Sequence, residues 1–546
     1  MSRFRLLVTD EIDREGVDLL RAEPAFDVDE VPTLPAAELA ARIGDYDAFV
    51  GRSASKIPAS LLERGKKLRV IGRAGVGTDN IDIPAATALG IAVINAPAGN
   101  TIAVAELFFG ALIGLVRHVP RAVESMRAGR WDRSDLLGTE LRGRSLGIVG
   151  LGRIGSEVAQ RARAFGMNIN AFDPYVNDER FDLLRVSRCA TLENLLRSSD
   201  IITVHTPLTS ETKGLIGDAE LSHLRPGSIV ANMARGGIVD EQALTRAVRE
   251  KRIGGAILDV FTEEPLSATN QLRSLDNVVL TPHLGASTAE GQRNVAVDVC
   301  AAVRDALLSG ELSRAINVVG GIDGQWEEIR PALVLVRRMA AIARAILADR
   351  GARAVNAVHL RVGRGLADAG NLLVSSAAAG ALDSVTDGIR LNLVNARSLA
   401  ETRGIALSVT TSGAHDPDNG AQVTVRSDGD EMLVAGVAAP GTGPRVTRIG
   451  GFIVDVTPRR TLLVLTNADV PGVIGRVGTV LGDSKVNIAE YHQARLTEGG
   501  AALAAVSVDG AINDVVKSRL MSLPDITSAT VVRLSELDPS GEQAWK

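Results

Sequence analysis

One short stretch constrains the fold of this chain more than any other: residues 147–159, GIVGLGRIGSEVA. Gly150, Gly152 and Gly155 have the spacing G-x-G-x-x-G, directly after a strand-like run and directly before a helix-like run. Such a turn lets the backbone approach a pyrophosphate at a helix N-terminus. The next strand-like run ends at Asp173, where an acid can accept hydrogen bonds from an adenosine ribose and repel a 2′-phosphate. The stretch predicts a dinucleotide-binding unit that prefers NAD to NADP, although a flavin fits the same glycine pattern.

Length and composition bound the class of protein. A chain of 546 residues is too long for one hydrophobic core and predicts roughly three to five domains. The net charge of −5 is small for this length and gives no reason to expect nucleic acid or a membrane as a partner. Cys189 and Cys300 have no C-x-x-C pairing, which argues against a structural metal. With no signal peptide and no apolar run of about 18 residues, we expect a soluble cytoplasmic protein.

Strand-like and helix-like segments alternate on both sides of the glycine motif. Four short apolar runs within residues 4–97 and six within residues 145–285 end in polar or glycine-containing loops. This alternation is typical of parallel α/β sheets. Residues 100–130 read as one long helical stretch, and another helical run follows His283 and ends near Gly310. If that last helix packs on the first unit, the cofactor domain is an insertion, which explains why the motif comes so late.

Three side chains follow predicted strands of the second unit: Arg235, Glu264 and His283. An arginine can bind a substrate carboxylate through two parallel hydrogen bonds. A histidine can take the hydroxyl proton of a 2-hydroxy acid while hydride leaves C2 for nicotinamide. A carboxylate on the other ring nitrogen fixes the tautomer of that histidine. The triple suits hydride transfer, but each residue also has a structural interpretation, as a turn-capping arginine, a helix-start glutamate or a loop histidine.

With these residues in view, the chain resembles a known family. GLGRIG, FDP, HTPLTSETKGLI, ANMARGGIVDEQAL, ILDVFTEEP and TPHLGAST occur in the order typical of the D-isomer-specific 2-hydroxyacid dehydrogenases, over roughly residues 1–315. GRAGVGTDNID and NAPAGNTIAVAEL narrow the resemblance to members that oxidise 3-phospho-D-glycerate. The resemblance implies that Arg235, Glu264 and His283 are the active-site residues. It also implies contacts with NAD from Val76, Gly150, Gly152, Arg153, Ile154, Gly155, Asp173, Thr206, Met233, Ala234, Arg235, Asp259, His283, Gly285 and Ala286.

The same resemblance implies the fold class and the domain organisation. A Rossmann-type cofactor domain, residues 99–284, is inserted in a flavodoxin-like substrate domain made of residues 1–98 and 285–316. An α+β intervening domain, residues 317–456, follows. An α+β ACT domain of ferredoxin-like topology, residues 457–535, ends the chain.

A phosphorylated substrate requires cations near the active site. Arg52, Ser53 and Arg73 follow strands of the first unit, and in similar enzymes such arginines hold the phosphate beside Arg235 and His283. Arg133 matches an arginine that a neighbouring subunit supplies in those enzymes. A buried guanidinium needs an anionic partner, so these cations favour a phosphorylated substrate. The alternative is that they are solvated surface arginines.

The C-terminal part resembles a regulatory module. In the family a serine effector binds between two ACT modules, which implies Asn467, Asp469 and Asn487 here. Because Asn467 stands where histidine or tyrosine is frequent, an ACT fold used only for dimerisation stays open. The intervening domain resembles one in which anions regulate activity, with Arg445 and Arg448 as candidates.

Together these features predict NAD-dependent oxidation of 3-phospho-D-glycerate to 3-phosphohydroxypyruvate, the first committed step of L-serine biosynthesis. We expect a homotetramer regulated by serine, with no metal. Two alternatives stay open. Another D-2-hydroxyacid dehydrogenase, such as a hydroxypyruvate or glyoxylate reductase, is disfavoured by Arg52, Arg73 and the regulatory tail. A non-catalytic NAD(H) sensor is disfavoured by the intact Arg235, Glu264 and His283.

Overall fold

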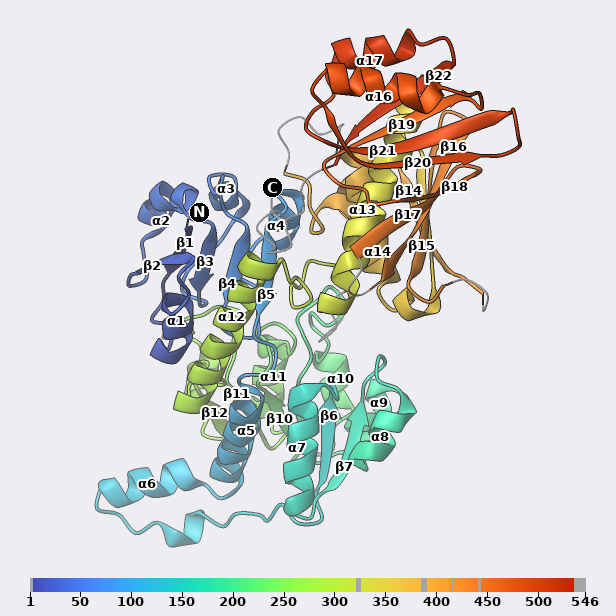
Figure 1. Cartoon of the computed structure of the whole chain (residues 1–546). Coiled ribbons are helices and arrows are strands. Elements are labelled where there is room, and N and C mark those ends of the chain that lie inside the picture. The colour runs from blue at the N-terminus through green and yellow to red at the C-terminus, as the bar shows by residue number, and fades with distance from the viewer. Residues whose placement is uncertain (1–2, 321–325, 384–389, 414–416, 440–442, 535–546) are drawn as a thin grey trace.

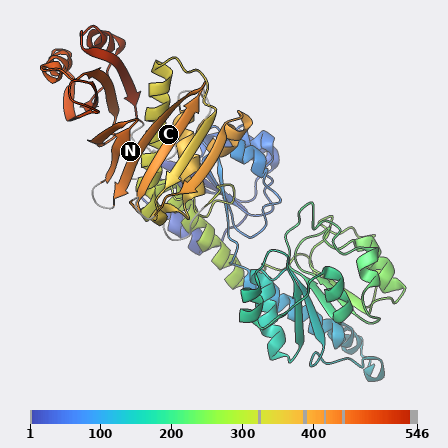
Figure 2. The same cartoon turned by 90° about the vertical axis from the view of Figure 1, so that its right-hand side faces the viewer.

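The computed structural model of this chain describes residues 3–320, 326–383, 390–413, 417–439 and 443–534. Four β-sheets follow one another along the sequence (Figure 1). The second sheet and its helices lie at one end of an elongated molecule and the fourth sheet lies at the other (Figure 2). The predicted α/β class with Rossmann-type parallel sheets is confirmed, and a β-rich C-terminal region follows it.

The first sheet has five parallel strands in the order β2-β1-β3-β4-β5, which is the flavodoxin-like order. The strands are β1 (Phe4–Val8), β2 (Phe26–Glu30), β3 (Ala48–Gly51), β4 (Val70–Arg73) and β5 (Ala92–Asn95). Strand β2 is absent from the four predicted runs, because its sequence FDVDE carries acids at alternate positions of an edge strand. The helices are α1 (Arg14–Arg21), α2 (Ala36–Arg42), α3 (Ala59–Leu62) and α4 (Ile83–Ala88), with a 3₁₀ turn η1 (Ile43–Asp45). Helix α12 (Ala289–Ser309) returns to pack on α1 and β4.

The second sheet has seven parallel strands in the order β12-β11-β10-β9-β6-β7-β8. They are β6 (Ser145–Val149), β7 (Asn168–Phe172), β8 (Ser187–Arg188), β9 (Ile201–Val204), β10 (Ile229–Asn232), β11 (Gly255–Leu258) and β12 (Val278–Leu280). The helices are α7 (Arg153–Ala164), α8 (Asp178–Leu184), α9 (Leu192–Ser198), α10 (Asp218–Ser222) and α11 (Glu241–Arg249), with η3 (Gln271–Ser274). The glycine motif links β6 to α7 at the centre of this sheet, beside β9, where the strand order reverses and doubly wound sheets bind their ligands.

The helical stretch predicted over residues 100–130 is two helices rather than one. Helix α5 (Thr101–Val116) ends two residues before His118, which has a left-handed φ of 53°, and α6 (Val119–Arg127) leaves at an angle of 63°. Pro120 has no N–H to donate to the carbonyl of Val116, so α5 cannot continue here, whereas proline is tolerated in the first turn of α6. Helix α6 and the turn η2 (Arg133–Asp135) form an arm that projects from the body (Figure 1).

No single helix in the described ranges is long and apolar enough to cross a bilayer. Helices α5 and α6, taken together across their 63° bend, are long and apolar enough by length and composition.

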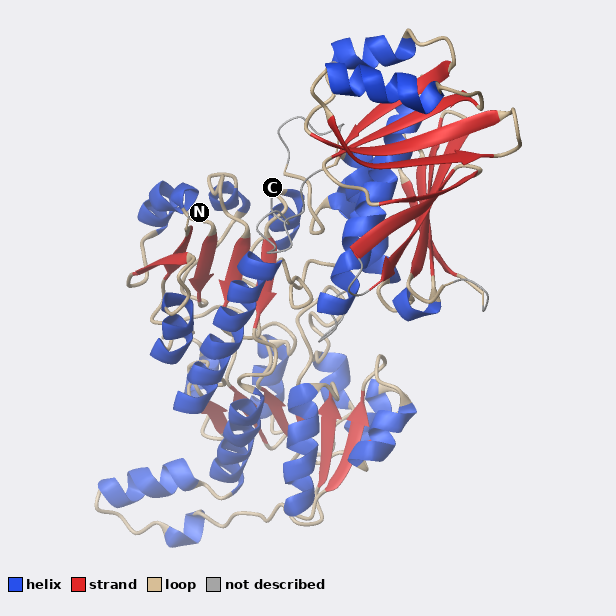
Figure 3. Cartoon of the chain, in the orientation of Figure 1, coloured by secondary structure: helices blue, strands red, loops and turns tan. Residues whose placement is uncertain are grey.

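The third and fourth sheets lie in the C-terminal part (Figure 3). The third has the order β14-β13-β15-β16-β17-β18, formed by β13 (Ala357–Val362), β14 (Ala406–Thr411), β15 (Gly420–Ser427), β16 (Asp430–Ala439), β17 (Gly443–Ile449) and β18 (Phe452–Val456). Helices α13 (Trp326–Asp349) and α14 (Gly370–Leu382) pack on it, and η4 (Arg364–Leu366) and α15 (Ala396–Thr402) complete this region.

The fourth sheet is antiparallel, in the order β20-β21-β19-β22. Its elements are β19 (Thr461–Ala468), α16 (Val473–Asp483), β20 (Asn487–Arg495), β21 (Ala501–Asp509), α17 (Asp514–Met521) and β22 (Ile526–Arg533). This βαββαβ order is ferredoxin-like. The expected last residue of this domain, Ser535, lies outside the described residues.

Candidate active site

The glycine turn leaves room above the N-terminus of α7. Gly150 has a φ of 92°, and a Cβ on Gly155 would collide with the carbonyl oxygen of Gly150. A Cβ on Gly152 would have no atom within 4 Å, so the space in front of the first turn of α7 is open. Arg153 and Ile154 begin this helix. An open backbone approach at a helix N-terminus is the geometry that a pyrophosphate requires.

The ends of the neighbouring strands carry polar groups suited to the rest of a dinucleotide. Asp173 follows β7, and its carboxylate accepts the N–H of Leu151 at 2.8 Å and that of Tyr175 at 2.9 Å. Each oxygen keeps lone pairs for ribose hydroxyls. Thr206 follows β9, and its buried hydroxyl has no hydrogen-bond partner among the described residues. A buried polar atom left without a partner fits a site that a ligand completes.

His283 and Glu264 lie within hydrogen-bond distance. Nδ1 of His283 is 2.8 Å from Oε2 of Glu264, and Oε1 of Glu264 accepts the N–H of Phe261 at 3.0 Å. Both carboxylate oxygens are thus occupied, so the carboxylate holds one tautomer of the imidazole, with Nδ1 protonated. The side chain of His283 is 47% exposed, which leaves Nε2 for a substrate proton.

A buried acid holds the loop that carries His283. Asp259, 1% exposed, accepts the hydroxyl of Thr281 at 2.6 Å and the N–H groups of Leu284 and Gly285 at 2.7 and 2.9 Å. Burial raises the pKa of Asp259, and these hydrogen bonds oppose the shift. His283 has a left-handed φ of 55°, and the bonds from Asp259 stabilise this conformation. Ala286 follows in the same loop, three residues before α12.

A second histidine near the site cannot take the proton-transfer role. The His205 ring stands edge-on to Phe108, and Thr203 Oγ1 lies 2.9 Å from its Nε2. Burial lowers the pKa of His205 to about 3, so the ring stays neutral at physiological pH. His283, whose side chain is 47% exposed, therefore stays the predicted proton acceptor.

Arg235 joins the two parallel-sheet domains. Its Nε donates to Oδ2 of Asp79 at 2.9 Å, and its Nη1 donates to the carbonyl of Ala234 at 2.6 Å. A Cβ on Gly77 would collide with Nη2 of Arg235, so the loop after β4 lies against the guanidinium. The sequence reasoning did not identify Asp79. The feature that could have identified Asp79 is its position, as an acid within the glycine-rich loop that follows a strand.

The loops that carry the catalytic candidates lie against one another. A Cβ on Gly236 would collide with the backbone of Phe261 and Thr262, so the loop after β10 touches the loop that leads to Glu264. On the opposite domain, Asn95 donates to the carbonyl of Val76 at 2.5 Å and fixes the loop expected at the nicotinamide. Met233, directly after β10, is buried.

Three arginines gather here. Burial, and after it the positive charges of Arg235 and Arg52, lower the pKa of Arg73 to about 10, although Asp79 and Asp10 act in the opposite direction. Among the described residues neither Arg52 nor Arg73 has a carboxylate within ion-pair distance. Ser53 is exposed next to Arg52. We define Arg52, Arg73, Arg235, Glu264 and His283 as the interdomain site.

Arg133 does not join the interdomain site within one chain. It lies in η2 on the projecting arm and is exposed (Figure 1). The arm also exposes apolar side chains, among them Trp131 at 78% and Leu137 at 89%. In the described part of the chain, no group of three or more His, Cys, Asp or Glu side chains could hold a metal ion.

Asn487 is separated from Asp469 within one chain. Asp469 lines a cavity of about 530 Å³, where its Oδ2 meets Arg495 at 3.3 Å and the N–H of Gly499 at 3.2 Å. Asn467 is buried and donates to the carbonyl of Ala468 at 2.7 Å, whereas its Oδ1 has no partner among the described residues. Asn487 starts β20, at the end of this strand opposite to Arg495, and donates to Asp509 at 2.8 Å.

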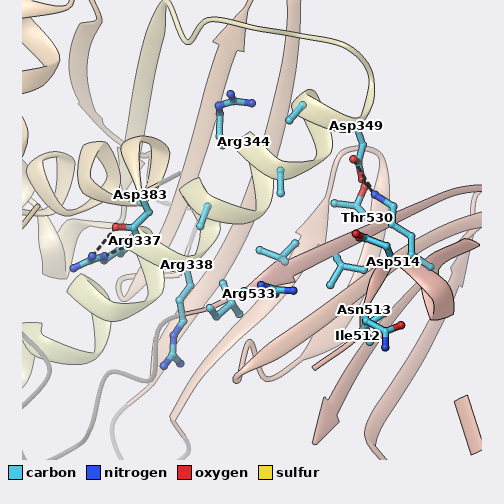
Figure 4. Close-up of a pocket in the computed structure, with 18 residues that line it drawn as sticks. Arg337, Arg338, Arg344, Asp349, Asp383, Ile512, Asn513, Asp514, Thr530 and Arg533 are labelled. Atoms are coloured by element: carbon cyan, nitrogen blue, oxygen red, sulfur yellow. Dashed lines mark hydrogen bonds and ion pairs between the residues drawn. The ribbon is translucent and has the colours of Figure 1, made fainter. Parts of the chain in front are cut away.

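A second cavity, of about 470 Å³, separates α13 from the last module (Figure 4). Its rim includes the ion pairs Arg337–Asp383 at 2.9 Å and Lys517–Asp349 at 3.1 Å.

The two arginines predicted to regulate the intervening domain both have partners. Arg445 forms an ion pair with Asp455 and lies 3.7 Å from Glu490. Arg448 donates to the carbonyl of Gly450 at 2.8 Å.

Comparison with known proteins places this fold and site in a class. Residues 109–285 match the family model "D-isomer specific 2-hydroxyacid dehydrogenase, NAD binding domain", so NAD is the cofactor of this domain. A glyoxylate reductase from Paecilomyes thermophila is similar in structure, with a TM-score of 0.54 and 30% identity, over 58% of this chain and 99% of its own.

Relatives that match nearly the whole chain narrow the class. The D-3-phosphoglycerate dehydrogenase of Synechocystis sp. is 38% identical over 97% of this chain and 95% of its own length. That of Bacillus subtilis is 38% identical over 97% of this chain and 100% of its own length. The chain belongs to the D-3-phosphoglycerate dehydrogenase family.

Proposed function

We propose that this chain oxidises 3-phospho-D-glycerate to 3-phosphohydroxypyruvate with NAD, the first committed step of L-serine biosynthesis. The similarity to D-3-phosphoglycerate dehydrogenases along 97% of the chain is the observation that carries the proposal. The similarity to glyoxylate reductase covers 58% of the chain and has no counterpart for the C-terminal part. Arg52 and Arg73 supply the cations that a phosphorylated substrate needs.

The proposed chemistry follows from the groups of the interdomain site. Arg235 keeps Nη2 and one N–H of Nη1 for the substrate carboxylate, because Nε is bound to Asp79. His283 takes the proton of the C2 hydroxyl on Nε2, and Glu264 stabilises the imidazolium that results. NAD, which the glycine turn and Asp173 would hold, would supply the acceptor for the hydride from C2.

Arg52, Ser53 and Arg73 bind the phosphate in this proposal, and Arg133 reaches it from a second copy of the chain. The exposed apolar side chains of the arm support such an assembly, and we propose a homotetramer. We also keep the four domains with the bounds given from the sequence, supported by the four sheets, and a cytoplasmic location.

L-Serine is the proposed effector, bound between two C-terminal modules. The cavity at Asp469 supports this because a carboxylate there suits an amino group. Asn487 lies at the far end of β20 and would come from the second module. Calorimetry with L-serine should give a binding signal that Asp469→Ala abolishes and Asp483→Ala, at the exposed end of α16, retains; identical signals in all three proteins would reject this site.

Turnover measured as NADH formation tests the main proposal. We expect 3-phospho-D-glycerate to be oxidised with a kcat/KM well above that for D-glycerate. An enzyme that ignores phosphoglycerate but reduces glyoxylate would support the reductase alternative. An absence of turnover with all substrates, together with NADH binding, would support the sensor alternative.

A further inference from the structure

The loop that carries Arg52 is held by hydrogen bonds to Asp10, a buried acid with a left-handed backbone. Residues 52–55 follow β3, and Asp10 follows β1, the neighbouring strand in the sheet. Asp10 is 6% exposed and has a left-handed φ of 63°, and Glu11 after it has a φ of 52°. Consecutive left-handed residues other than glycine persist only where their surroundings stabilise them, and such positions cluster at functional sites.

The carboxylate of Asp10 binds both ends of the loop. Oδ2 accepts the N–H of Arg52 at 2.8 Å and the N–H of Ser55 at 3.1 Å. Oδ1 accepts the hydroxyl of Ser55 at 2.9 Å. One buried carboxylate thus closes the loop by three hydrogen bonds, which fixes the distance between its first and last residues.

Asn80 binds the same two residues through their carbonyl groups. Its Nδ2 donates to the carbonyl of Arg52 at 3.0 Å and to that of Ser55 at 2.7 Å. The N–H groups of Ser53 and Ala54, between these anchors, have no hydrogen-bond partner among the described residues. The exposed tip of the loop therefore presents two backbone donors and a guanidinium, which suits a phosphate.

We propose that Asp10 and Asn80 are positioning residues that shape the loop of residues 52–55 and so set the preference for a phosphorylated over an unphosphorylated 2-hydroxy acid. Neither needs to touch the substrate, because each acts through Arg52 and Ser55. This inference rests on the proposed function, since the phosphate end of the substrate is what the loop would recognise.

The experiment compares variants of the full-length enzyme. Asp10→Gly removes both acceptor oxygens, and with them all three hydrogen bonds, and keeps the left-handed backbone, which glycine adopts without strain. Asp10→Asn retains an oxygen for both N–H groups and removes the charge. Asn80→Ala removes the two donors on the other side. Asp13→Asn is the matched control, because it neutralises an acid three residues away and asparagine caps α1 equally well.

We expect Asp10→Gly and Asn80→Ala to lower the ratio of kcat/KM for 3-phospho-D-glycerate to that for D-glycerate by about 10²-fold, mainly through KM. Asp10→Asn should recover most of the ratio, and Asp13→Asn should not change it. NADH binding, followed by fluorescence, should stay within twofold in every variant. A ratio that stays constant in both loss variants would overturn the inference. An equal loss for both substrates and for NADH would assign Asp10 and Asn80 a merely structural role and would also overturn it.

The wild-type protein separates the two proposals. If it oxidises phosphoglycerate, the ratio decides the inference alone. If it does not, the proposed function fails, and calorimetry with inorganic phosphate on the NADH-loaded protein decides the inference instead. Weaker phosphate binding in Asp10→Gly than in Asp13→Asn would then support it, and equal binding would overturn it. Should Asp10→Gly fail to fold, Asn80→Ala carries the comparison.

Discussion

Arginines are arranged differently in the two halves of this molecule. In the C-terminal half Arg445 meets Asp455 and Glu490, and Arg337 meets Asp383. Of the three arginines in the interdomain site, Arg235 alone has a carboxylate within ion-pair distance among the described residues, Asp79, and Arg73 is partly buried beside the like charges of Arg235 and Arg52. Burying a cation without a partner is costly, so a fold keeps such a cluster only where an anion completes it.

Whether an arginine has a carboxylate partner indicates whether its charge is available to a ligand. Counting arginines along the sequence does not show which of them are neutralised. The carboxylates that neutralise Arg445 come from β18 and β20, which are separate segments of the sequence. In the interdomain site, Arg52 and Arg73 have no carboxylate within ion-pair distance among the described residues, so positive charge is left there for a substrate. The predictions below test this contrast, from the largest expected effect to the smallest.

Replacing the proposed base should have the largest effect. His283→Asn keeps the size of a polar side chain and removes proton transfer, so we expect kcat to fall by about 10²–10⁴-fold. NADH affinity, measured by fluorescence, should change far less than kcat. A control is His359→Asn in β13, whose ring bonds Ser408 at 2.9 Å and which should keep full activity. Near-normal turnover of His283→Asn would reject His283 as the base.

Conservative replacement of arginine should separate the two halves. Arg235→Lys keeps the charge but loses the planar fork, so kcat/KM for phosphoglycerate should fall by about 10²-fold. Arg445→Lys makes the same change at a neutralised arginine and should leave kcat/KM within twofold. Steady-state kinetics of both variants gives the comparison directly. Equal losses would show that pairing with carboxylates does not distinguish functional arginines.

Alkaline pH should weaken binding of the phosphate. Arg73 carries a charge below its pKa of about 10 and loses it above that pH. If that charge binds phosphate, KM for phosphoglycerate should be about fourfold higher at pH 10.5 than at pH 9. KM for D-glycerate, which has no phosphate, should lack this component. The same pH dependence for the two substrates would separate Arg73 from phosphate recognition.

Breaking a paired cation of the C-terminal half should have the smallest effect. Lys517→Met removes the ion pair between α17 and Asp349 of α13, and both side chains are about one-third exposed. We expect a loss of about 0.2–1 kcal/mol of stability, measured as a small decrease in the thermal midpoint, with kcat/KM unchanged. Asp349→Asn and the double variant complete a cycle for the pair. A large kinetic change would show that this pair communicates with the interdomain site.

Much of this architecture could be predicted because its signals are local. Apolar runs and the glycine spacing predicted the parallel sheets, and the ends of such strands meet at one edge, which brings Glu264 and His283 together. Strand β2 was missed because an edge strand with alternating acids has no apolar run. The break at His118 was missed although Pro120, two residues later, is a local signal for it.

What could not be predicted depends on contacts between distant segments. Asp79 reaches Arg235 across the two domains, and no local pattern links positions so far apart. Asp10 stands at the end of a strand, as Asp173 does, but its left-handed backbone and its bonds to Arg52 and Ser55 exist only in the folded chain. The separation of Asn487 from Asp469 likewise follows from the direction of β20.

A crystal structure of the full-length protein with NADH and 3-phospho-D-glycerate tests the central claim most directly. The account predicts the phosphate within hydrogen-bond distance of Arg52 and Arg73, the carboxylate on Arg235, and the C2 hydroxyl on Nε2 of His283. A phosphoglycerate molecule bound instead in the cavity between α13 and the last module, with the interdomain site empty, would contradict it.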